Sequence, residues 1–113
     1  MRNCNLPEIL ALILTLVVIP PVSAQQAGEQ LIEKFRCYAC HPLTQASIGP
    51  AYQAIAARHG DRKTLMTDVL ARKIVAGGGG NWGLVPMVPN QWVNLDEARV
   101  MATRILEQTP SRP

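Results

Sequence analysis

The segment CYACH at residues 37–41 holds the side chains of this chain that are best suited to chemistry. Two thiols separated by two residues can each form a thioether with a vinyl group of a haem, and the adjacent histidine can ligate its iron. A thioredoxin-like pair would need a βαβ context, and a zinc site would need further ligands where only His59 remains. Thiol redox chemistry and zinc binding stay as alternatives. The spacing predicts one covalent haem c, attached through Cys37 and Cys40 and ligated by His41.

Met87 is the candidate for the sixth position on the iron. It lies in the segment PMVP at residues 86–89, whose prolines fix their own φ angles and favour extended backbone at the preceding residues. A stiff loop of this kind can hold a soft thioether on a metal. Met66 and Met101 fall on helical stripes instead, where methionine usually fills a core. An iron closed by histidine and methionine favours electron transfer, whereas an open iron favours oxygen or peroxide chemistry.

Three segments accompany the CxxCH motif in a fixed order along the chain: IGPAY at 48–52, GNWG at 80–83 and PMVPN at 86–90. Together they resemble class I c-type cytochromes, most closely the bacterial cytochrome c-551 (c8) group, over nearly the whole chain after residue 24. The resemblance implies a small all-α cytochrome c fold of about four short helices wrapped around one covalently bound haem.

The resemblance also implies roles for single residues. In this family the Pro50 position offers its carbonyl to the iron-ligating histidine, and the Trp82 position hydrogen-bonds a haem propionate. Lys73 stands where the family often has a basic partner for a propionate. The Asn90 position supports the side of the site that carries the methionine ligand. The glycine run at residues 77–80 is richer than in most members, so a looser distal loop is expected.

The hydrophobic periodicity predicts the helices that position these groups, and no segment alternates with the period of a strand. The first helix covers residues 28–36, places Leu31, Ile32 and Phe35 on one side, and runs directly into the CxxCH segment. The second covers residues 51–58. Both helices therefore adjoin segments expected to contact the haem.

A third helix is expected to be capped by Asp61, to continue to about Ala76 and to end at the glycine run 77–80. Its apolar stripe comprises Leu65, Met66, Val69, Leu70 and Ile74. Residues 81–92 are interrupted by prolines and glycines and are expected to form a loop.

The last helix is expected to begin at Asn94, an N-cap residue, with Glu97 completing a capping box. Its inward face comprises Ala98, Met101, Ala102 and Ile105. Residues 25–113 are expected to form one cytochrome c domain, with His59 at its surface. A domain this small with few aromatic residues needs extra apolar bulk, which a buried haem would supply. The haem-free chain is therefore expected to be largely unstructured.

Residues 1–24 are predicted to be a cleavable signal peptide that directs the chain to the periplasm. An apolar run at 9–19 is followed by a proline pair and by the small residues Val22 and Ala24, which suit signal peptidase. The run is about half the ~20 residues that a membrane-spanning helix needs, so a retained anchor is the weaker alternative. Cys4 would leave with this segment, and no membrane insertion of the remaining chain is expected.

The net charge of +3 is modest, and the basic residues are scattered, which disfavours nucleic-acid binding. A mild positive field suits docking on acidic surfaces of redox proteins. We expect a monomeric periplasmic electron-transfer protein, not an enzyme, that shuttles single electrons between redox partners through a His/Met-ligated haem c. The alternatives are a haem subunit of a larger oxidoreductase, and a haem enzyme or sensor in which Met87 is displaced.

Overall fold

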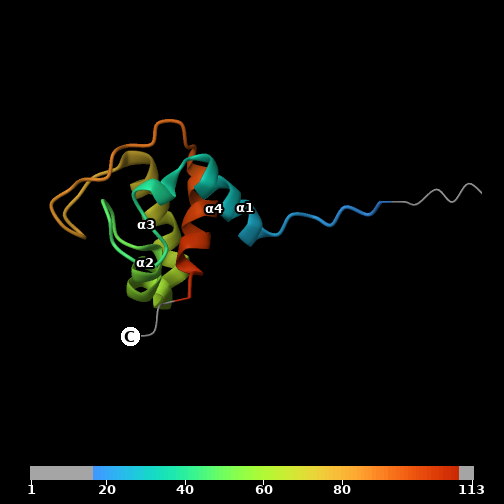
Figure 1. Cartoon of the computed structure of the whole chain (residues 1–113), viewed down its shortest axis with the longest axis horizontal. Coiled ribbons are helices and arrows are strands. Elements are labelled where there is room, and N and C mark those ends of the chain that lie inside the picture. The colour runs from blue at the N-terminus through green and yellow to red at the C-terminus, as the bar shows by residue number, and fades with distance from the viewer. Residues whose placement is uncertain (1–16, 110–113) are drawn as a thin grey trace, which may run out of the picture.

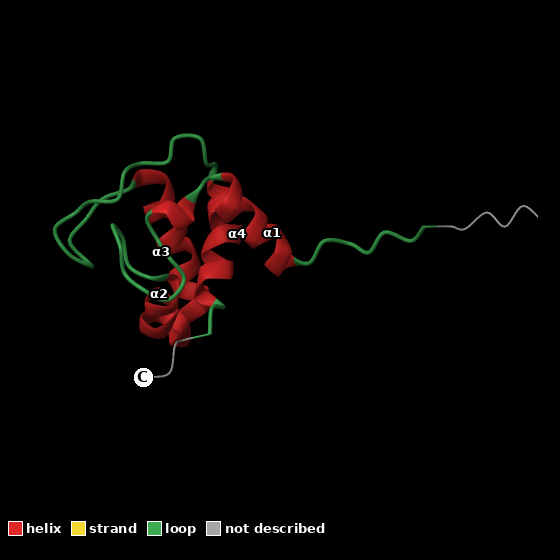
Figure 2. Cartoon of the chain, in the orientation of Figure 1, coloured by secondary structure: helices red, strands yellow, loops and turns green. Residues whose placement is uncertain are grey.

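A computed structural model of the chain describes residues 17–109. This part of the chain is built from helices and loops, and it contains no strand (Figure 2). The α-helices are α1 (Ala24–Lys34), α2 (Tyr52–His59), α3 (Lys63–Ala76) and α4 (Leu95–Leu106), with 3₁₀ turns at Cys37–Ala39 and Gly60–Arg62. The expected all-α fold with about four short helices is confirmed.

Helices α1 and α4 pack directly against each other, with α1 on the side of the fold from which the N-terminal segment extends (Figure 1). Their close approach depends on Gly28, because a Cβ atom there would lie 2.5 Å from the Cβ of Arg104. Ile32 on α1 is fully buried in the same contact region. The predicted inward face of α4, formed by Ala98, Met101, Ala102 and Ile105, is buried as well. Helix α4 thus packs against both α1 and α3, and its contact with α3 is the more extensive one.

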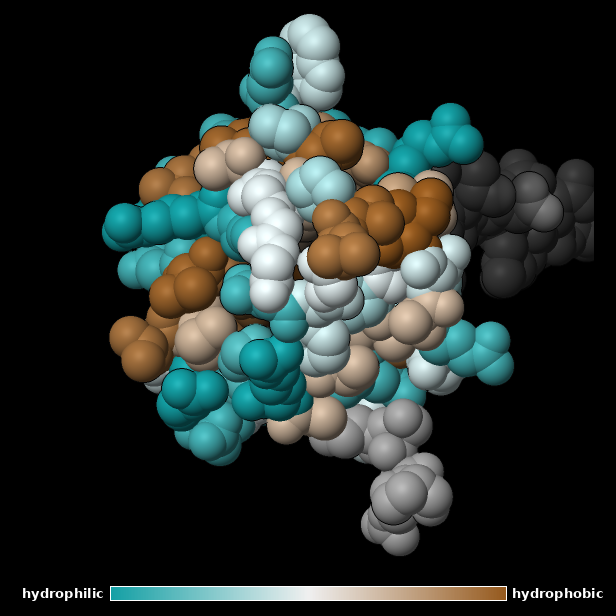
Figure 3. Space-filling view, turned by 90° about the vertical axis from the view of Figure 1, so that its left-hand side faces the viewer, coloured by the Kyte–Doolittle hydropathy of each residue, from teal (hydrophilic) through white to brown (hydrophobic). Residues whose placement is uncertain are grey.

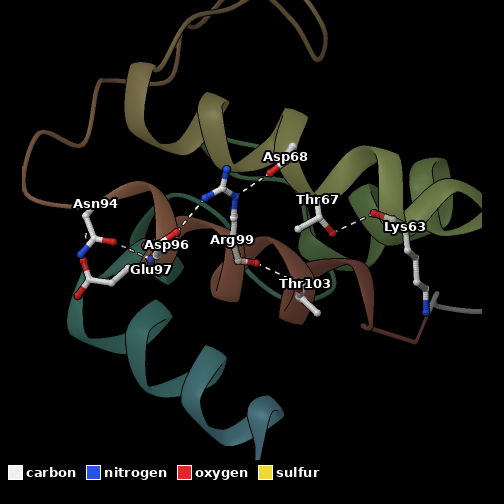
Figure 4. A network of polar contacts seen from close by, with 8 residues as sticks. All are labelled: Lys63, Thr67, Asp68, Asn94, Asp96, Glu97, Arg99 and Thr103. Carbon is white, nitrogen blue, oxygen red and sulfur yellow. Dashed lines mark hydrogen bonds and ion pairs between the residues drawn. The ribbon is translucent and has the colours of Figure 1, made fainter.

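Helix α4 begins with the predicted capping box. The Glu97 amide donates to the Asn94 side-chain oxygen at 2.8 Å, and the Asn94 amide donates to the Glu97 carboxylate at 3.2 Å. One turn further along, Arg99 donates to Asp96 at 2.8 Å and to Asp68 on α3 at 2.7 Å (Figure 4). These ion pairs are solvent-exposed, so they align α3 with α4 more than they stabilise the fold.

Three predicted helix boundaries are wrong. Helix α1 begins at Ala24, where Ser23 and Gln26 form a second capping box, and it ends at Lys34. It does not run into the CxxCH segment, because Arg36 adopts a left-handed conformation with φ of 57°. Asp61 does not cap α3 either, since it lies within the 3₁₀ turn that precedes the helix.

The predicted apolar stripe of α3 is only partly buried. Ile74 belongs to the core, whereas Leu65 is 65% exposed and Val69 is 50% exposed. Met66, expected to fill the core, lines a cavity together with Val69. The reason is that α3 buries only part of this stripe against α4. Met66, Val69 and Leu70 line the cavity, and Leu65 lies outside it.

Residues 17–23 run away from the helices as an extended, exposed segment before α1 begins (Figure 1). Cys4 and most of the predicted signal peptide lie outside the described residues. Within the described part, none of the helices has the length and hydrophobicity needed to cross a membrane.

Candidate haem site

A cavity of about 900 Å³ lies between α2, α3 and two loops that project to the left in Figure 1. This volume is within the range of cofactor sites. The predicted cofactor-binding residues all line it: Cys37, Cys40, His41, Pro50, Lys73, Trp82, Met87 and Asn90. Figure 3 faces this side of the molecule and shows apolar side chains interspersed with polar ones. The fold therefore gathers at one cavity residues that are far apart in the sequence.

The CxxCH segment is shaped by a tight turn after α1. The amides of Cys40 and His41 both donate to the Cys37 carbonyl, at 3.1 and 3.0 Å. Neither cysteine of the described chain forms a disulfide. Burial raises the pKa of the Cys37 thiol, while a hydrogen bond from the Tyr52 hydroxyl acts in the opposite direction. Both cysteines are thus part-buried and line the same cavity.

The ring of His41 is held on three sides. Its Nδ1 lies 2.9 Å from the Pro50 carbonyl oxygen, and the ring stacks on Tyr52 with centroids 5.4 Å apart and planes 9° apart. Gly49 lies against the same ring, so closely that a Cβ atom there would overlap it. Since the carbonyl can only accept, Nδ1 carries the proton and Nε2 is left with the lone pair that a metal requires.

The loop that carries Met87 is tied to the end of α3. Backbone hydrogen bonds of 2.8 and 2.9 Å pair Met87 with Gly78. Gly77 has a φ of 70°, and a Cβ atom there would overlap the Met87 carbonyl. The glycine run therefore permits a close backbone pairing that holds the loop, in contrast to the looser loop expected from its composition.

Asn90 fixes the other end of this loop. Its side-chain amide donates to the Ile74 carbonyl at 2.9 Å, and its backbone amide donates to the Val75 carbonyl at 3.1 Å. These carbonyls belong to the last turn of α3, where no intrahelical donor is available. Asn90 thus satisfies the helix end and anchors the segment that positions Met87.

The charges along the cavity wall have one sign. The lining includes Arg36, Arg58, Arg72 and Lys73 and, within the described chain, no aspartate or glutamate. The Arg58 guanidinium lies 4.8 Å from the centre of the Trp82 ring and donates to the Asn81 carbonyl at 3.0 Å. A haem carries two anionic propionates, so the wall provides charge of the sign they need. The residues present fit the cofactor that the CxxCH motif predicts.

Residues of α2 contribute more to this site than sequence reasoning indicated. Tyr52 stacks on His41, and Ile55, Arg58 and His59 also line the cavity. His59, predicted to be a surface residue, is part-buried: it lines the cavity, and its Nδ1 is enclosed. These residues are spaced by one or two helical turns, and this spacing could have indicated that they share one face of the helix.

The zinc alternative has no support in the described part of the chain. No three histidine, cysteine, aspartate or glutamate side chains among residues 17–109 lie close enough together to hold a metal ion.

Known proteins with related sequences place the chain in a family. It is 37% identical to cytochrome c-551 of Azotobacter vinelandii over 81 residues, which cover 72% of this chain and 96% of that protein. It is 46% identical to cytochrome c-552 of Hydrogenobacter thermophilus over 80 residues, which cover 71% and 80% of the two chains. The crystal structure of Nitrosomonas europaea cytochrome c552 matches with a TM-score of 0.67 and 37% identity, over 72% of this chain and 99% of that one. The chain matches no protein-family model. With its CxxCH segment at the wall of a haem-sized cavity, the chain belongs to the class I c-type cytochromes of the c-551 group and carries one covalently attached haem c.

Proposed function

We propose that this small electron-transfer haem protein is a periplasmic carrier of single electrons, in which His41 and Met87 ligate the iron. The observation that carries the proposal is that both residues line one cavity, His41 held through its side chain and Met87 through its backbone. His41 is held by the Pro50 carbonyl, and Met87 is held by its pairing with Gly78. The bound haem supplies a one-electron couple between ferric and ferrous iron.

On the histidine side, residues of the folded chain set the orientation of the ligand. The Pro50 carbonyl accepts a hydrogen bond from the N–H at Nδ1, which selects the tautomer with a basic Nε2. Tyr52 stacks on the ring and Gly49 lies against it, and both contacts limit its rotation. A ligand that needs no reorientation keeps the same geometry in both oxidation states, which favours fast electron exchange.

On the methionine side, the thioether is part-buried and packs against the core cluster. The loop is held at Met87 itself through Gly78 and at its far end through Asn90. A soft thioether in an apolar setting stabilises ferrous iron, so we expect a comparatively high reduction potential. The same bracing opposes displacement of Met87 by small ligands such as carbon monoxide or peroxide.

The propionates are proposed to contact the basic side of the cavity, through Trp82, Lys73 and Arg58. Trp82 is 43% exposed and its indole N–H is a donor only, which suits an anionic acceptor. Lys73 is part-buried at the cavity wall, with its ammonium close to Gly78.

Electron exchange is proposed to occur at the cavity side of the molecule, where large apolar side chains are exposed. Ile48 is 63% exposed, Val85 is 66% exposed and Val88 is 71% exposed, and all of them line the cavity. Basic residues surround them, so redox partners with acidic docking surfaces are expected. We propose that the protein acts as a monomer after removal of residues 1–24.

Absorption spectra of purified ferric and ferrous protein test the ligand set. We expect low-spin iron in both states and a sulfur-to-iron charge-transfer band in the ferric form. Met87→Ala should lose that band and retain the haem. Met66→Ala is the matched control, because it also removes a thioether from the cavity wall and should keep the band. High-spin ferric iron in the unmutated protein would refute the carrier and favour a haem enzyme or sensor.

A further inference from the structure

Arg36 joins the end of α1 to the CxxCH segment through a left-handed backbone conformation, with φ of 57° and ψ of 33°. No other non-glycine residue has a positive φ in the part of the chain that the structure describes. The Cβ atom of an L-residue crowds the backbone in this conformation, so the position that follows a helix is usually glycine. We therefore expect arginine here to stabilise the fold less than glycine would.

The backbone of Arg36 cannot relax without the loss of local hydrogen bonds. Its amide donates to the Glu33 carbonyl at 2.9 Å, and its carbonyl accepts from the Ala39 amide at 3.1 Å. The first bond closes the end of α1, and the second begins the 3₁₀ turn that carries Cys37. Strain that the surrounding structure enforces in this way is typical of functional positions. The side chain of Arg36 is therefore the feature that needs a role.

The Arg36 side chain is exposed and lines the haem cavity next to Cys37. It forms no ion pair with an acidic side chain among residues 17–109. The haem propionates are not its expected partner, because a haem carries its vinyl groups on the side of the ring opposite its propionates, and Cys37 attaches through a vinyl group. Arg36 thus places a positive charge, unpaired within the described chain, at the vinyl edge of the haem.

We propose that the guanidinium of Arg36 binds a carboxylate on the surface of an acidic redox partner and holds that partner at the vinyl edge of the haem. The proposal rests on the proposed electron-carrier function and names the residue that recognises the partner. Arginine suits this role because it is always protonated and can bind a carboxylate through two parallel N–H groups. No aspartate or glutamate of the described chain lines the cavity, so no acidic side chain on this wall competes with the partner's carboxylate. The unfavourable backbone at residue 36 is retained because glycine there would remove the contact.

Three variants separate the charge of residue 36 from its backbone strain. Arg36→Gly removes the charge and permits the positive φ, whereas Arg36→Lys retains both the charge and the Cβ atom. Lys63→Gln removes one charge from an exposed residue outside the cavity lining. Denaturant unfolding should give a higher midpoint for Arg36→Gly than for the unmutated protein and an unchanged midpoint for Arg36→Lys. A midpoint for Arg36→Gly that does not rise would contradict the strain.

Stopped-flow absorption then measures the rate at which three probes oxidise the ferrous holoprotein: an acidic blue-copper protein, the anion ferricyanide and the cation tris(phenanthroline)cobalt(III). At low salt, Arg36→Gly should react about two- to fivefold more slowly than the unmutated protein with the copper protein and with ferricyanide, which is the size of one ion pair at contact in water. Its rate with the cobalt complex should be equal or higher. Arg36→Lys and Lys63→Gln should stay close to the unmutated rates. The differences should disappear at high salt, where exposed charges are screened.

Equal rates of Arg36→Gly and the unmutated protein with the copper protein would overturn the proposal, and so would an equal loss in Lys63→Gln. Slower oxidation by all three probes would also overturn it, because the loss of one charge cannot slow both an anion and a cation. The unmutated protein separates these results from a failure of the proposed function, which high-spin iron or slow oxidation by every probe would reveal. Low-spin iron and fast oxidation of the unmutated protein, with unchanged rates in Arg36→Gly, would refute the docking role alone.

Discussion

Gly49→Ala should displace the imidazole of His41. A Cβ atom at residue 49 would overlap the ring, lying 2.6 Å from Nδ1 and 3.0 Å from Nε2. The φ angle of Gly49 is not in the left-handed range, so the substitution adds this contact without backbone strain. The ring cannot move away freely, because Tyr52 stacks on it and the Pro50 carbonyl holds Nδ1.

The magnitude follows from two contributions. Overpacking of a filled site costs about 1–3 kcal/mol, and loss of the hydrogen bond from Nδ1 to Pro50 costs about 0.5–1.5 kcal/mol. We expect the free energy of unfolding of the holoprotein to fall by roughly 1.5–4.5 kcal/mol. Denaturant unfolding monitored by circular dichroism measures this change. Absorption spectra of the same samples should show a perturbed iron, because His41 is the proposed ligand.

Gly60→Ala is the matched control. Gly60 has a φ of −66°, and a Cβ atom there would meet nothing closer than 3.9 Å. The same change of residue type should therefore leave the iron spectrum unchanged and alter stability by less than about 1 kcal/mol. A Gly49→Ala protein with the same stability and the same absorption spectrum as the unmutated protein would refute the packing of Gly49 against His41.

Three further predictions concern the scaffold. Asn94→Ala removes the side-chain acceptor of the α4 capping box, and denaturant unfolding should show a loss of about 1 kcal/mol, whereas an unchanged midpoint would exclude a stabilising cap. Tyr38 donates to Glu29, and burial together with this bond raises the pKa of Tyr38 from 10.0 to about 12. The contribution of this bond to stability is present below pH 10 and is lost as pH rises towards about 12. In a plot of the free energy of unfolding against pH, Tyr38→Phe should therefore show a smaller decrease over this interval than the unmutated protein. An equal decrease in both proteins would contradict the contact. A chain with both Cys37 and Cys40 replaced by alanine should carry no covalent haem. It should also show little helical circular dichroism, because the cavity then lacks its apolar filling. Full helicity of this variant would disprove the dependence of folding on haem.

The sequence predicted the helices better than it predicted their ends. Asn94 caps α4 as expected because a capping box involves residues that are neighbours in the chain. Asp61 had the right residue type for a cap, but the 3₁₀ turn that contains it places the helix start later. The exposure of Leu65 could not be predicted, because hydrophobic periodicity does not distinguish a residue facing the core from one facing solvent or a cofactor.

Haem attachment and the candidate iron ligands were determined by the sequence alone, because their signals are local. The spacing of Cys37, Cys40 and His41 lies within one turn, and the prolines that stiffen the Met87 loop are its immediate neighbours. Whether these groups could meet was decided by the tertiary structure. The contact of His41 with the Pro50 carbonyl closes a loop, and the pairing of Met87 with Gly78 joins the distal loop to α3. The inward position of His59 depends on how α2 packs beside the cavity. Such contacts depend on segments far apart in the chain, and only the packing of the folded protein brings those segments together.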